Sequence, residues 1–336
     1  AVMGSKRLKA VVVKKTRTIQ PYNKEDISVL TRDTIQRIKS NPAVEGLSQH
    51  GTAGDLIEIN EEGLLPTKNW STGWFPKGAE KITGSVMSDT ILKKRSTCYG
   101  CSVGCKRVVE IPGKVDPIYG GPEYETCAAM GSYCGIDCLE TIAAANQLCN
   151  MYGMDTIACG GTIAFAMECY EKGIIDIKDT DGLELRFGSK EELLILIEQI
   201  ARRKGFGEQL AGGSMQFAEK IGKDAKALSM SVKNHELPAH MPQGKPAVGL
   251  IYAVNPFGAD HQSSEHDSTL SMPADSRERK RLAMIGAVES EYNAYGLDYD
   301  KVRFAYDSQC YYSLLDSLCL CQFVWGPSWQ LFGPSD

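Results

Sequence analysis

Apolar residues recur along much of this chain at the spacing of helices. In the segment EELLILIEQIARRKG, the apolar positions follow a helical period, Ser189 and Glu192 form a capping-box pattern, and Gly205 is the expected stop. A further amphipathic pattern over residues 206–221 predicts a second helix directly after the first.

Two more helices are predicted in the middle of the chain. A capping box at Asp137 and Glu140 opens the first of them, and Gly153 is its expected C-terminal stop. Asp155 then has the position of an N-cap, and the helix that it begins should extend to Gly173.

The remaining segments are more mixed. Helices are expected again over residues 275–295 and 301–320, whereas residues 10–13 predict an apolar strand and residues 40–51 have the composition of a loop. Residues 237–267 are rich in Pro, Gly and His and predict a long ordered loop, a feature that is usually functional in compact domains. The fold class predicted from these patterns is mainly α.

Composition excludes several kinds of protein. The chain of 336 residues is long enough for two or three domains, and its hydrophobic (43%) and charged (24%) fractions are ordinary for a soluble globular protein. Its net charge of −5 offers no basic surface, so nucleic acid is not an expected partner. No apolar run approaches the roughly 20 residues of a membrane span, and no signal peptide is visible.

The twelve cysteines change the picture more than the overall composition does. Disulfide-rich secreted chains are usually small and loop-rich, so this count indicates metal use in a reducing compartment, the cytoplasm. One group lies at helical spacing among small apolar residues and is expected to be buried without ligands. Its members are Cys127, Cys134, Cys138, Cys149, Cys159 and Cys169.

The segment CYGCSVGCK, residues 98–106, has the spacing C-x2-C-x3-C on a turn rich in Gly and Ser. Such a turn can wrap one face of a [4Fe–4S] cluster, because glycines let backbone amides approach the sulfurs. A fourth thiolate could come from DSLCLCQF, which offers Cys319 and Cys321. A zinc site with four thiolates and a set of unligated thiols remain open, although zinc sites more often use two C-x2-C pairs.

Five motifs occur in order: CYGCSVGC, GPEYET, AANQLCNMYGMDT, FGADH and DSLCLCQF. Together they resemble the tungsten-dependent aldehyde:ferredoxin oxidoreductases, and AVMGSKRLKAVVV looks like the end of that family's N-terminal domain. The resemblance implies the multihelical, two-domain C-terminal part of that fold. Expected are a β remnant of the N-terminal domain (1–18), a helical domain with the thiol motif (19–228), and an incomplete second helical domain (229–336).

The resemblance also implies cofactors and partners. The family binds a bis-pyranopterin with tungsten or molybdenum, with magnesium bridging the pterin phosphates as a further expectation. A [4Fe–4S] cluster, ligated here by Cys98, Cys101, Cys105 and Cys321, would pass electrons to ferredoxin or another iron–sulfur protein. A homodimer remains open.

Two family motifs of the form D-x-x-G-L-(C/D) hold the pterins and map onto NMYGMD and DSLCLC. The resemblance thereby assigns cofactor contacts to Asn150, Asp155, Asp316 and Leu320. A carboxylate at a helix end can accept strong, charge-assisted bonds from pterin N–H groups. This sequence departs from the pattern because Asn150 replaces an aspartate and Cys319 replaces a glycine, and Asp155 also fits a plain helix N-cap.

Two residues match the family's acid–base pair. The resemblance implies that Glu123 is the general base and that His261 hydrogen-bonds the substrate carbonyl and stabilises the developing charge. From the residues alone, Glu125 could replace the former and His266 the latter. No histidine has a glutamate three residues before it, so the E-x-x-H iron that joins subunits in some family members is not expected.

The activity implied by the resemblance is oxidation of a small aldehyde to a carboxylic acid. One alternative is a tungsten-dependent reductase that resembles the active-site subunit of benzoyl-coenzyme A reductase. A second alternative, from a different class, is a non-catalytic iron–sulfur electron carrier, which would leave Glu123, His261 and Asp316 without a role.

The isolated chain is expected to bind no stable pterin and to oxidise no aldehyde, although its cluster motif is complete. In the family the N-terminal β domain forms one wall of the pterin site, and a large anionic cofactor held on one side loses most of its charge-assisted bonds. Mass spectrometry for tungsten, molybdenum and iron on anaerobically prepared chain checks this. Stoichiometric tungsten or molybdenum would contradict it.

Overall fold

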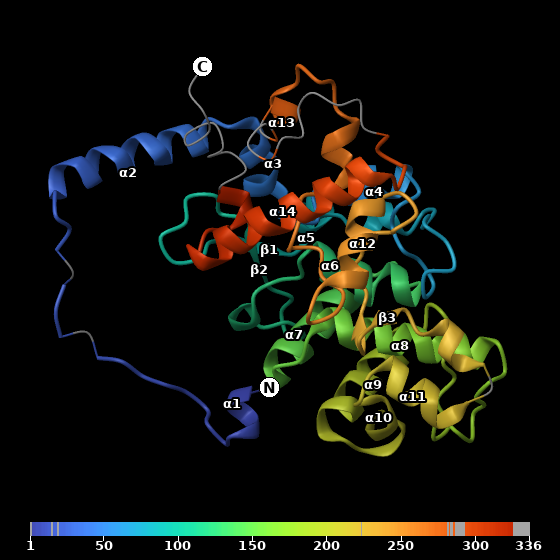
Figure 1. Ribbon diagram of the computed structural model, residues 1–336. Helices are drawn as coiled ribbons and strands as arrows, with labels where there is room; N and C mark the ends of the chain where they lie inside the picture. The colour runs from blue at the N-terminus through green and yellow to red at the C-terminus, as the bar shows by residue number, and fades with distance from the viewer. Residues whose placement is uncertain are drawn as a thin grey trace.

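The computed structural model describes residues 2–14, 16–18, 20–222, 224–280, 282, 285 and 293–324. In these residues the protein is mainly helical, as the sequence predicts (Figure 1). The longer helices are α2 (Lys24–Lys39), α3 (Pro42–His50), α7 (Leu139–Tyr152), α8 (Thr156–Glu171), α9 (Lys190–Arg202), α11 (Ser214–Ile221), α12 (Pro246–Val254) and α14 (Tyr299–Ser317). The shorter helices are α1 (Val2–Ser5), α4 (Leu56–Glu61), α5 (Gly84–Thr90), α6 (Tyr124–Met130), α10 (Gly205–Leu210) and α13 (Arg277–Lys280). No helix in this part of the chain is long and apolar enough to span a membrane.

Strands are few and form two antiparallel pairs. The strand β1 (Leu92–Ser96) pairs with β2 (Lys106–Val109), and β3 (Ser231–Val232) pairs with β4 (His235–Glu236). Ser96 lies opposite Lys106, so residues 97–105 form the loop that closes the first hairpin. This loop carries the C-x2-C-x3-C motif.

The core is centred on α6 and α8, which cross at close range. A Cβ atom on Gly160 of α8 would lie 2.5 Å from the carbonyl oxygen of Ala129 in α6, so this crossing requires a glycine. Every residue of α6 except Glu125 is buried, and α8 is buried from Cys159 through Met167. Glu123, which directly precedes α6, and Glu125, in its first turn, are therefore held by a rigid part of the molecule.

Several sequence predictions of helix ends are confirmed. Gly153 ends α7 with a left-handed backbone (φ 70°), and the Asp155 side chain accepts hydrogen bonds from Ile157 N and Ala158 N at the start of α8. The capping box at Asp137 is wrong. The helix begins at Leu139, and Asp137 instead pairs with Lys81.

Two predictions near the N-terminus are also wrong. Residues 10–13 form no strand, and Val11, Val12 and Val13 are 73–90% exposed, because a lone extended segment has no neighbouring strand to satisfy its backbone. Residues 40–51, expected to be a loop, contain helix α3, which is anchored by the buried Val44. In Figure 1, α2 and the segment before it extend away from the rest of the chain.

Three further predictions need adjustment. The helix expected over 206–221 is divided into α10 and α11, because Gly213 between them adopts φ 91°. The predicted loop 237–267 contains helix α12. Over 275–295, the described residues include the short α13, and residues 281, 283, 284 and 286–292 lie outside the description.

The segment before the last helix is fixed by a buried ion pair. Lys301 Nζ lies 2.6 Å from Asp267 Oδ1, and both side chains are 1% exposed. Asp267 also accepts hydrogen bonds from Ala247 N and Val248 N at the start of α12, and Lys301 donates to the Ala294 carbonyl. One carboxylate therefore joins α12 to α14.

Replacing Lys301 with Met should destabilise the chain by about 3–5 kcal/mol, because it leaves a buried carboxylate without its counter-charge. Urea unfolding measures the loss. Lys114→Met is the matched control: it breaks an exposed pair with Glu140 (2.9 Å), which solvent screens, and should cost far less. Similar losses in the two variants would contradict the assigned importance of the buried pair.

Candidate functional site

The thiol loop is shaped by glycines and by one apolar anchor. Gly100 and Gly104 adopt φ 70° and 72°, which other residues rarely do, and Val103 is buried between them. Val103 N lies 3.4 Å from Cys101 Sγ, so a backbone amide already approaches a thiol as the sequence predicts.

A buried arginine ties this loop to α3. The Arg107 guanidinium donates to the carbonyls of Ser48 (3.0 Å), Gln49 (2.7 Å) and Gly104 (2.6 Å). Burial is the main cause that lowers its pKa. The tie fixes the orientation of the loop against the helix that precedes it.

The structure brings Cys321 to the same thiol group. Cys101, Cys105 and Val324 pack on one apolar cluster that includes Val103. The pKa of Cys105 rises to about 11, first because of burial and then because Glu123, Cys321, Cys101 and Cys98 lie near it. Cys319 does not contribute to that shift.

The four thiols fit a multi-metal cluster better than a lone zinc ion. Each would repel the others as a thiolate, so holding all four in that form requires cations between them. No three of these sulfurs lie within 4.8 Å of one another, whereas four bonds of about 2.3 Å to one zinc would bring them closer. Cluster ligation by Cys98, Cys101, Cys105 and Cys321 remains a prediction with this support.

The two predicted pterin motifs fold into the same turn. Met154 N donates to the Cys149 carbonyl (2.8 Å), and Leu320 N donates to the Leu315 carbonyl (2.9 Å), so each motif ends its helix with the same 6→1 bond. The residue before each donor has a left-handed backbone: Gly153 at φ 70° and Cys319 at φ 57°. Cys319 therefore occupies a position that favours glycine.

The predicted cofactor-contact residues of these motifs lie on the surface. Asn150, Asp155, Asp316 and Leu320 are exposed, so cofactor atoms could reach them. Asn150 donates to the Asn146 carbonyl (3.0 Å), and Asp155 serves as the N-cap of α8. Their role in binding a pterin stays a prediction.

Glu123 stands at the start of α6, next to the thiol group. Its Oε2 accepts a 2.5 Å hydrogen bond from Thr52, whose hydroxyl in turn accepts from Tyr124 N. Burial raises the pKa of Glu123, against the effect of the Thr52 hydrogen bond. A raised pKa suits the general base that the sequence predicts.

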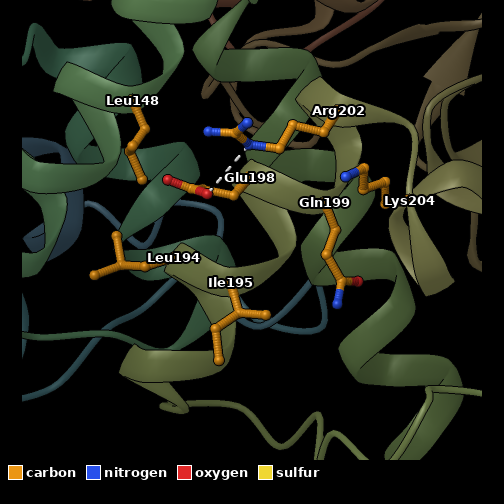
Figure 2. A pocket seen from close by; sticks show the side chains of 7 residues that line it. All are labelled: Leu148, Leu194, Ile195, Glu198, Gln199, Arg202 and Lys204. Atoms are coloured by element: carbon orange, nitrogen blue, oxygen red, sulfur yellow. Dashed lines mark ion pairs between the residues drawn. The ribbon is translucent and has the colours of Figure 1, made fainter.

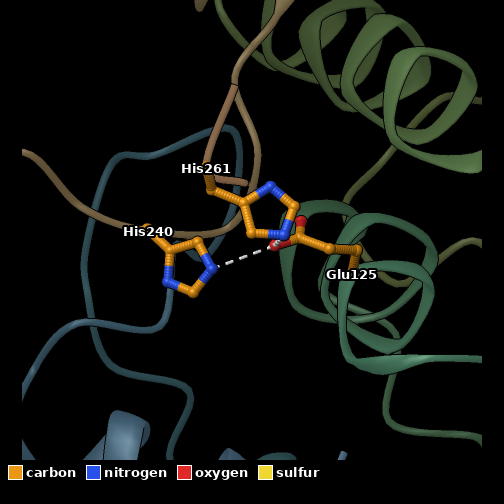
Figure 3. Close-up of side chains that lie close together, drawn as sticks. All are labelled: Glu125, His240 and His261. Carbon is orange, nitrogen blue, oxygen red and sulfur yellow. Dashed lines mark ion pairs between the residues drawn. The ribbon is translucent and has the colours of Figure 1, made fainter. Parts of the chain in front are cut away.

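The carboxylate beside His261 is that of Glu125. Figure 3 shows the rings of His240 and His261 converging on it, with both Nε2 atoms close to Oε1, at 3.2 Å and 3.3 Å respectively. Oε1 of Glu125 and Nδ1 of His261 are buried atoms that make no hydrogen bond. They are the two polar atoms with which this group could bind a ligand.

Aromatic residues of the core hold this group in place. Glu125 Oε2 accepts from Ala239 N (2.8 Å), and Tyr124 donates through its hydroxyl to the Ala239 carbonyl (2.7 Å). Tyr133 donates to the Leu237 carbonyl (3.0 Å). The backbone just before His240 is thereby fixed to α6 and the turn that follows it.

Two members of the group, His240 and Lys245, were not among the residues predicted from the sequence. His240 is buried, and its Nδ1 lies 3.0 Å from Nζ of Lys245, which also lies 3.5 Å from Nδ1 of His266. The signal was the Pro-, Gly- and His-rich composition of residues 237–267, which marked the segment as functional but not its individual residues.

Glu125, His240 and His261 could by their geometry hold a metal ion. In the described part of the chain they are the one group of at least three such side chains with all ligand atoms within 4.8 Å. Lys245 argues against a metal, because an amine that donates to Nδ1 of His240 leaves the proton of the neutral ring on Nε2, the atom that would have to ligate.

A surface pocket of about 360 Å³ lies elsewhere, on α7 and α9 (Figure 2). Leu148, Leu194 and Ile195 form its apolar wall, and Glu198 pairs with Arg202 at 3.4 Å along α9. None of the predicted site residues lines it.

Comparison with known proteins agrees with these features. The family profile described as "Aldehyde ferredoxin oxidoreductase, domains 2 & 3" matches residues 29–334. The tungsten-containing aldehyde ferredoxin oxidoreductase of Pyrococcus furiosus is 42% identical over 265 residues, which cover 78% of this chain and 43% of the relative. The "aliphatic sulfonate oxidoreductase, WOR-like subunit" of the same organism is 30% identical over 286 residues, which cover 82% and 44%.

A solved structure shares the fold. The active site complex BamBC of benzoyl coenzyme A reductase, bound to 1,5 dienoyl-CoA, matches with a TM-score of 0.69 over 96% of this chain and 53% of that chain, at 20% identity. The family profile and the relatives together define the class of the protein. The chain belongs to the aldehyde ferredoxin oxidoreductase family, whose domains 2 and 3 it matches, and it spans less than half the length of the curated relatives.

Cys321→Ala should remove iron and the brown colour from anaerobically prepared protein, whereas Cys319→Ala should not. The reason is that Cys321 lies near the other three thiols, and Cys319 occupies a helix-terminal turn. Iron analysis and visible absorption measure the outcome, and Cys319→Gly is a second control suited to the left-handed backbone. Equal loss from Cys319→Ala, or loss from it alone, would show that the fourth ligand is misassigned.

Proposed function

We propose that this chain forms the helical part of an enzyme that oxidises a small aldehyde to a carboxylic acid at a bis-pyranopterin tungsten or molybdenum centre. The overall reaction is RCHO + H2O → RCOOH + 2H⁺ + 2e⁻. When bound, a pterin-held metal would supply the two-electron redox chemistry, and a [4Fe–4S] cluster held by the thiols would supply a route for the electrons to ferredoxin. Family membership and the names of the 42% identical relatives support the substrate class.

The observation that carries the proposal is the buried acid–base group next to the thiol loop. Glu123 and Glu125 lie at the start of one rigid helix, and Glu123 is close enough to Cys105 to raise the pKa of that thiol. An electron carrier needs no buried carboxylates beside its cluster. The arrangement instead suits a reaction that releases protons and electrons at neighbouring points.

Each residue has a chemical role in this proposal. Glu123, whose pKa is raised by burial, would take a proton from the attacking water. His261 would donate from Nδ1 to the carbonyl oxygen, and Glu125, 3.3 Å from Nε2, would orient the ring and balance its charge. Burial of the group excludes water and strengthens both interactions.

The exposed ends of two helices would hold the cofactor. Asn150, Asp155 and Asp316 offer hydrogen-bond acceptors to pterin N–H groups, with Leu320 beside them. Both motifs present these residues on the same kind of turn, which is what two similar pterins require. The four thiols already discussed would hold the cluster.

A reductive enzyme is the second candidate, since the matched fold includes the BamBC complex of benzoyl coenzyme A reductase. The relative named as an aliphatic sulfonate oxidoreductase shows that substrates differ among similar chains. Tungsten or molybdenum content, together with aldehyde-dependent viologen reduction by the full-length protein, separates aldehyde oxidation from both this candidate and an electron carrier.

In the full-length protein, Glu123→Gln should lower aldehyde turnover by roughly two to four orders of magnitude, because it removes the base and keeps the shape. Steady-state viologen reduction measures the change, with tungsten and iron content unchanged. Glu125→Gln should have the smaller effect expected of an orienting residue, about ten- to a hundredfold. Near-normal turnover in Glu123→Gln with a large loss in Glu125→Gln would move the role of base to Glu125.

A further inference from the structure

Three imidazoles share one small, buried space, and they differ in their partners. The ring centroid of His240 lies 4.9 Å from that of His261 and 4.5 Å from that of His266. Three rings at this distance cannot all be protonated cheaply, because like charges in a poorly solvated site repel strongly. Their other contacts therefore decide which nitrogen of each ring carries the proton.

Lys245 occupies the Nδ1 side of two of these rings. Its Nζ lies 3.0 Å from Nδ1 of His240 and 3.5 Å from Nδ1 of His266, and the residue is 5% exposed. An amine offers only N–H donors when charged, so both Nδ1 atoms must be acceptors. A ring that accepts at Nδ1 carries its single proton at Nε2.

The opposite sides of the two rings agree with this assignment. His266 Nε2 lies 2.9 Å from the carbonyl oxygen of His261, which only accepts, and His240 Nε2 lies 3.2 Å from Glu125 Oε1. His266 therefore has a donor at Nδ1 and an acceptor at Nε2, the pattern of a neutral imidazole. His240 has the same donor at Nδ1, and its Nε2 faces the Glu125 carboxylate without a hydrogen bond to Oε1.

His261 is different, because Lys245 does not reach it. Its Nε2 faces Glu125 Oε1 at 3.3 Å, and its Nδ1 is buried without a hydrogen-bond partner. This ring therefore faces a carboxylate on one side and the open position of a ligand on the other.

We propose that Lys245 is a positioning residue that keeps His240 and His266 neutral by donating to both Nδ1 atoms, which leaves Nδ1 of His261 as the ring nitrogen of this group that can contact a ligand. The assignment of neutral rings stands on the contacts alone. Its consequence for catalysis, with His261 as the donor to the substrate carbonyl, rests on the proposed function.

The charges around the group are consistent with this role. The pKa of His240 is lowered by burial first, then by Lys245 and His261, and the pKa of His266 by burial, His240 and Lys245. Burial also lowers the pKa of Lys245, while nearby carboxylates oppose that effect. Those carboxylates are Glu62 after α4, Asp267 after α12, and Glu125 in α6.

The direct test is ¹⁵N NMR of the chain labelled at histidine, at about pH 6, close to the ordinary pKa of the side chain. The signals of His240 and His266, assigned with His240→Gln and His266→Gln, should show Nδ1 without a proton and Nε2 with one. Lys245→Met should make at least one of the two rings gain a proton at Nδ1. Lys245→Arg, which keeps the donor, should resemble the unchanged chain.

Lys233→Met is the control, since Lys233 also donates a short hydrogen bond (2.6 Å to the Asn255 carbonyl) but is exposed and lies outside the group. It should leave both rings unchanged. A doubly protonated His240 in the unchanged chain would overturn the proposal even if Lys245→Met fails to fold. Unchanged rings in a folded Lys245→Met would also overturn it, and so would stoichiometric zinc binding that His240→Gln abolishes.

Kinetics of the full-length protein form a separate readout. Lys245→Met should lower kcat by about ten- to a hundredfold with little change in KM, and Lys245→Arg should restore most of it. If the unchanged full-length protein oxidises no aldehyde, the proposed function fails, and the NMR result still decides the protonation of the rings. A KM effect alone would contradict the positioning role.

Discussion

The contact between α6 and the backbone of residues 237–239 is the constraint on which the candidate site depends. This backbone is irregular and buried, so its polar groups need partners other than those of a helix or sheet. Tyr124, Glu125 and Tyr133 supply them through two hydroxyls and one carboxylate. Because these side chains project from the most buried part of the core, they fix His240 where a loop alone would leave it variable.

Buried charge is balanced locally around this contact. Glu125 faces two histidines, Lys245 lies between two imidazole nitrogens, and Asp267 pairs with Lys301. An isolated charge in such a place would be strongly unfavourable, whereas a carboxylate next to an imidazole or an amine is stabilised by its neighbour. Two buried polar atoms of this group, Oε1 of Glu125 and Nδ1 of His261, make no hydrogen bond and could therefore contact a ligand.

Helix α14 connects the acid–base group to the thiol group. On its inner side Ser308 accepts from Glu265 N (2.6 Å) and Tyr312 donates to the Glu265 carboxylate (3.2 Å), which fixes the chain next to His266. Its C-terminal turn leads directly to Cys321. A rigid helix of this kind keeps a constant distance between the acid–base group, where protons would leave, and the thiol group, where electrons would leave.

The sequence by itself determined the local features: the mainly helical class, the end of α7 at Gly153, the cap at Asp155, and the burial of most of the middle cysteines. These depend on short-range patterns of apolar and capping residues, which one sequence displays. It also identified Cys321 as a candidate partner of the thiol loop, through motif resemblance.

Only the tertiary structure decided which side chains meet. It placed Glu125 rather than Glu123 beside His261, and it added His240 and Lys245 to the group. It also showed that residues 10–13 form no strand and that residues 40–51 include a helix. The physical reason is the same in each case: pairing, burial and the protonation of a ring depend on partners far apart in the chain, and spacing along the sequence does not specify them.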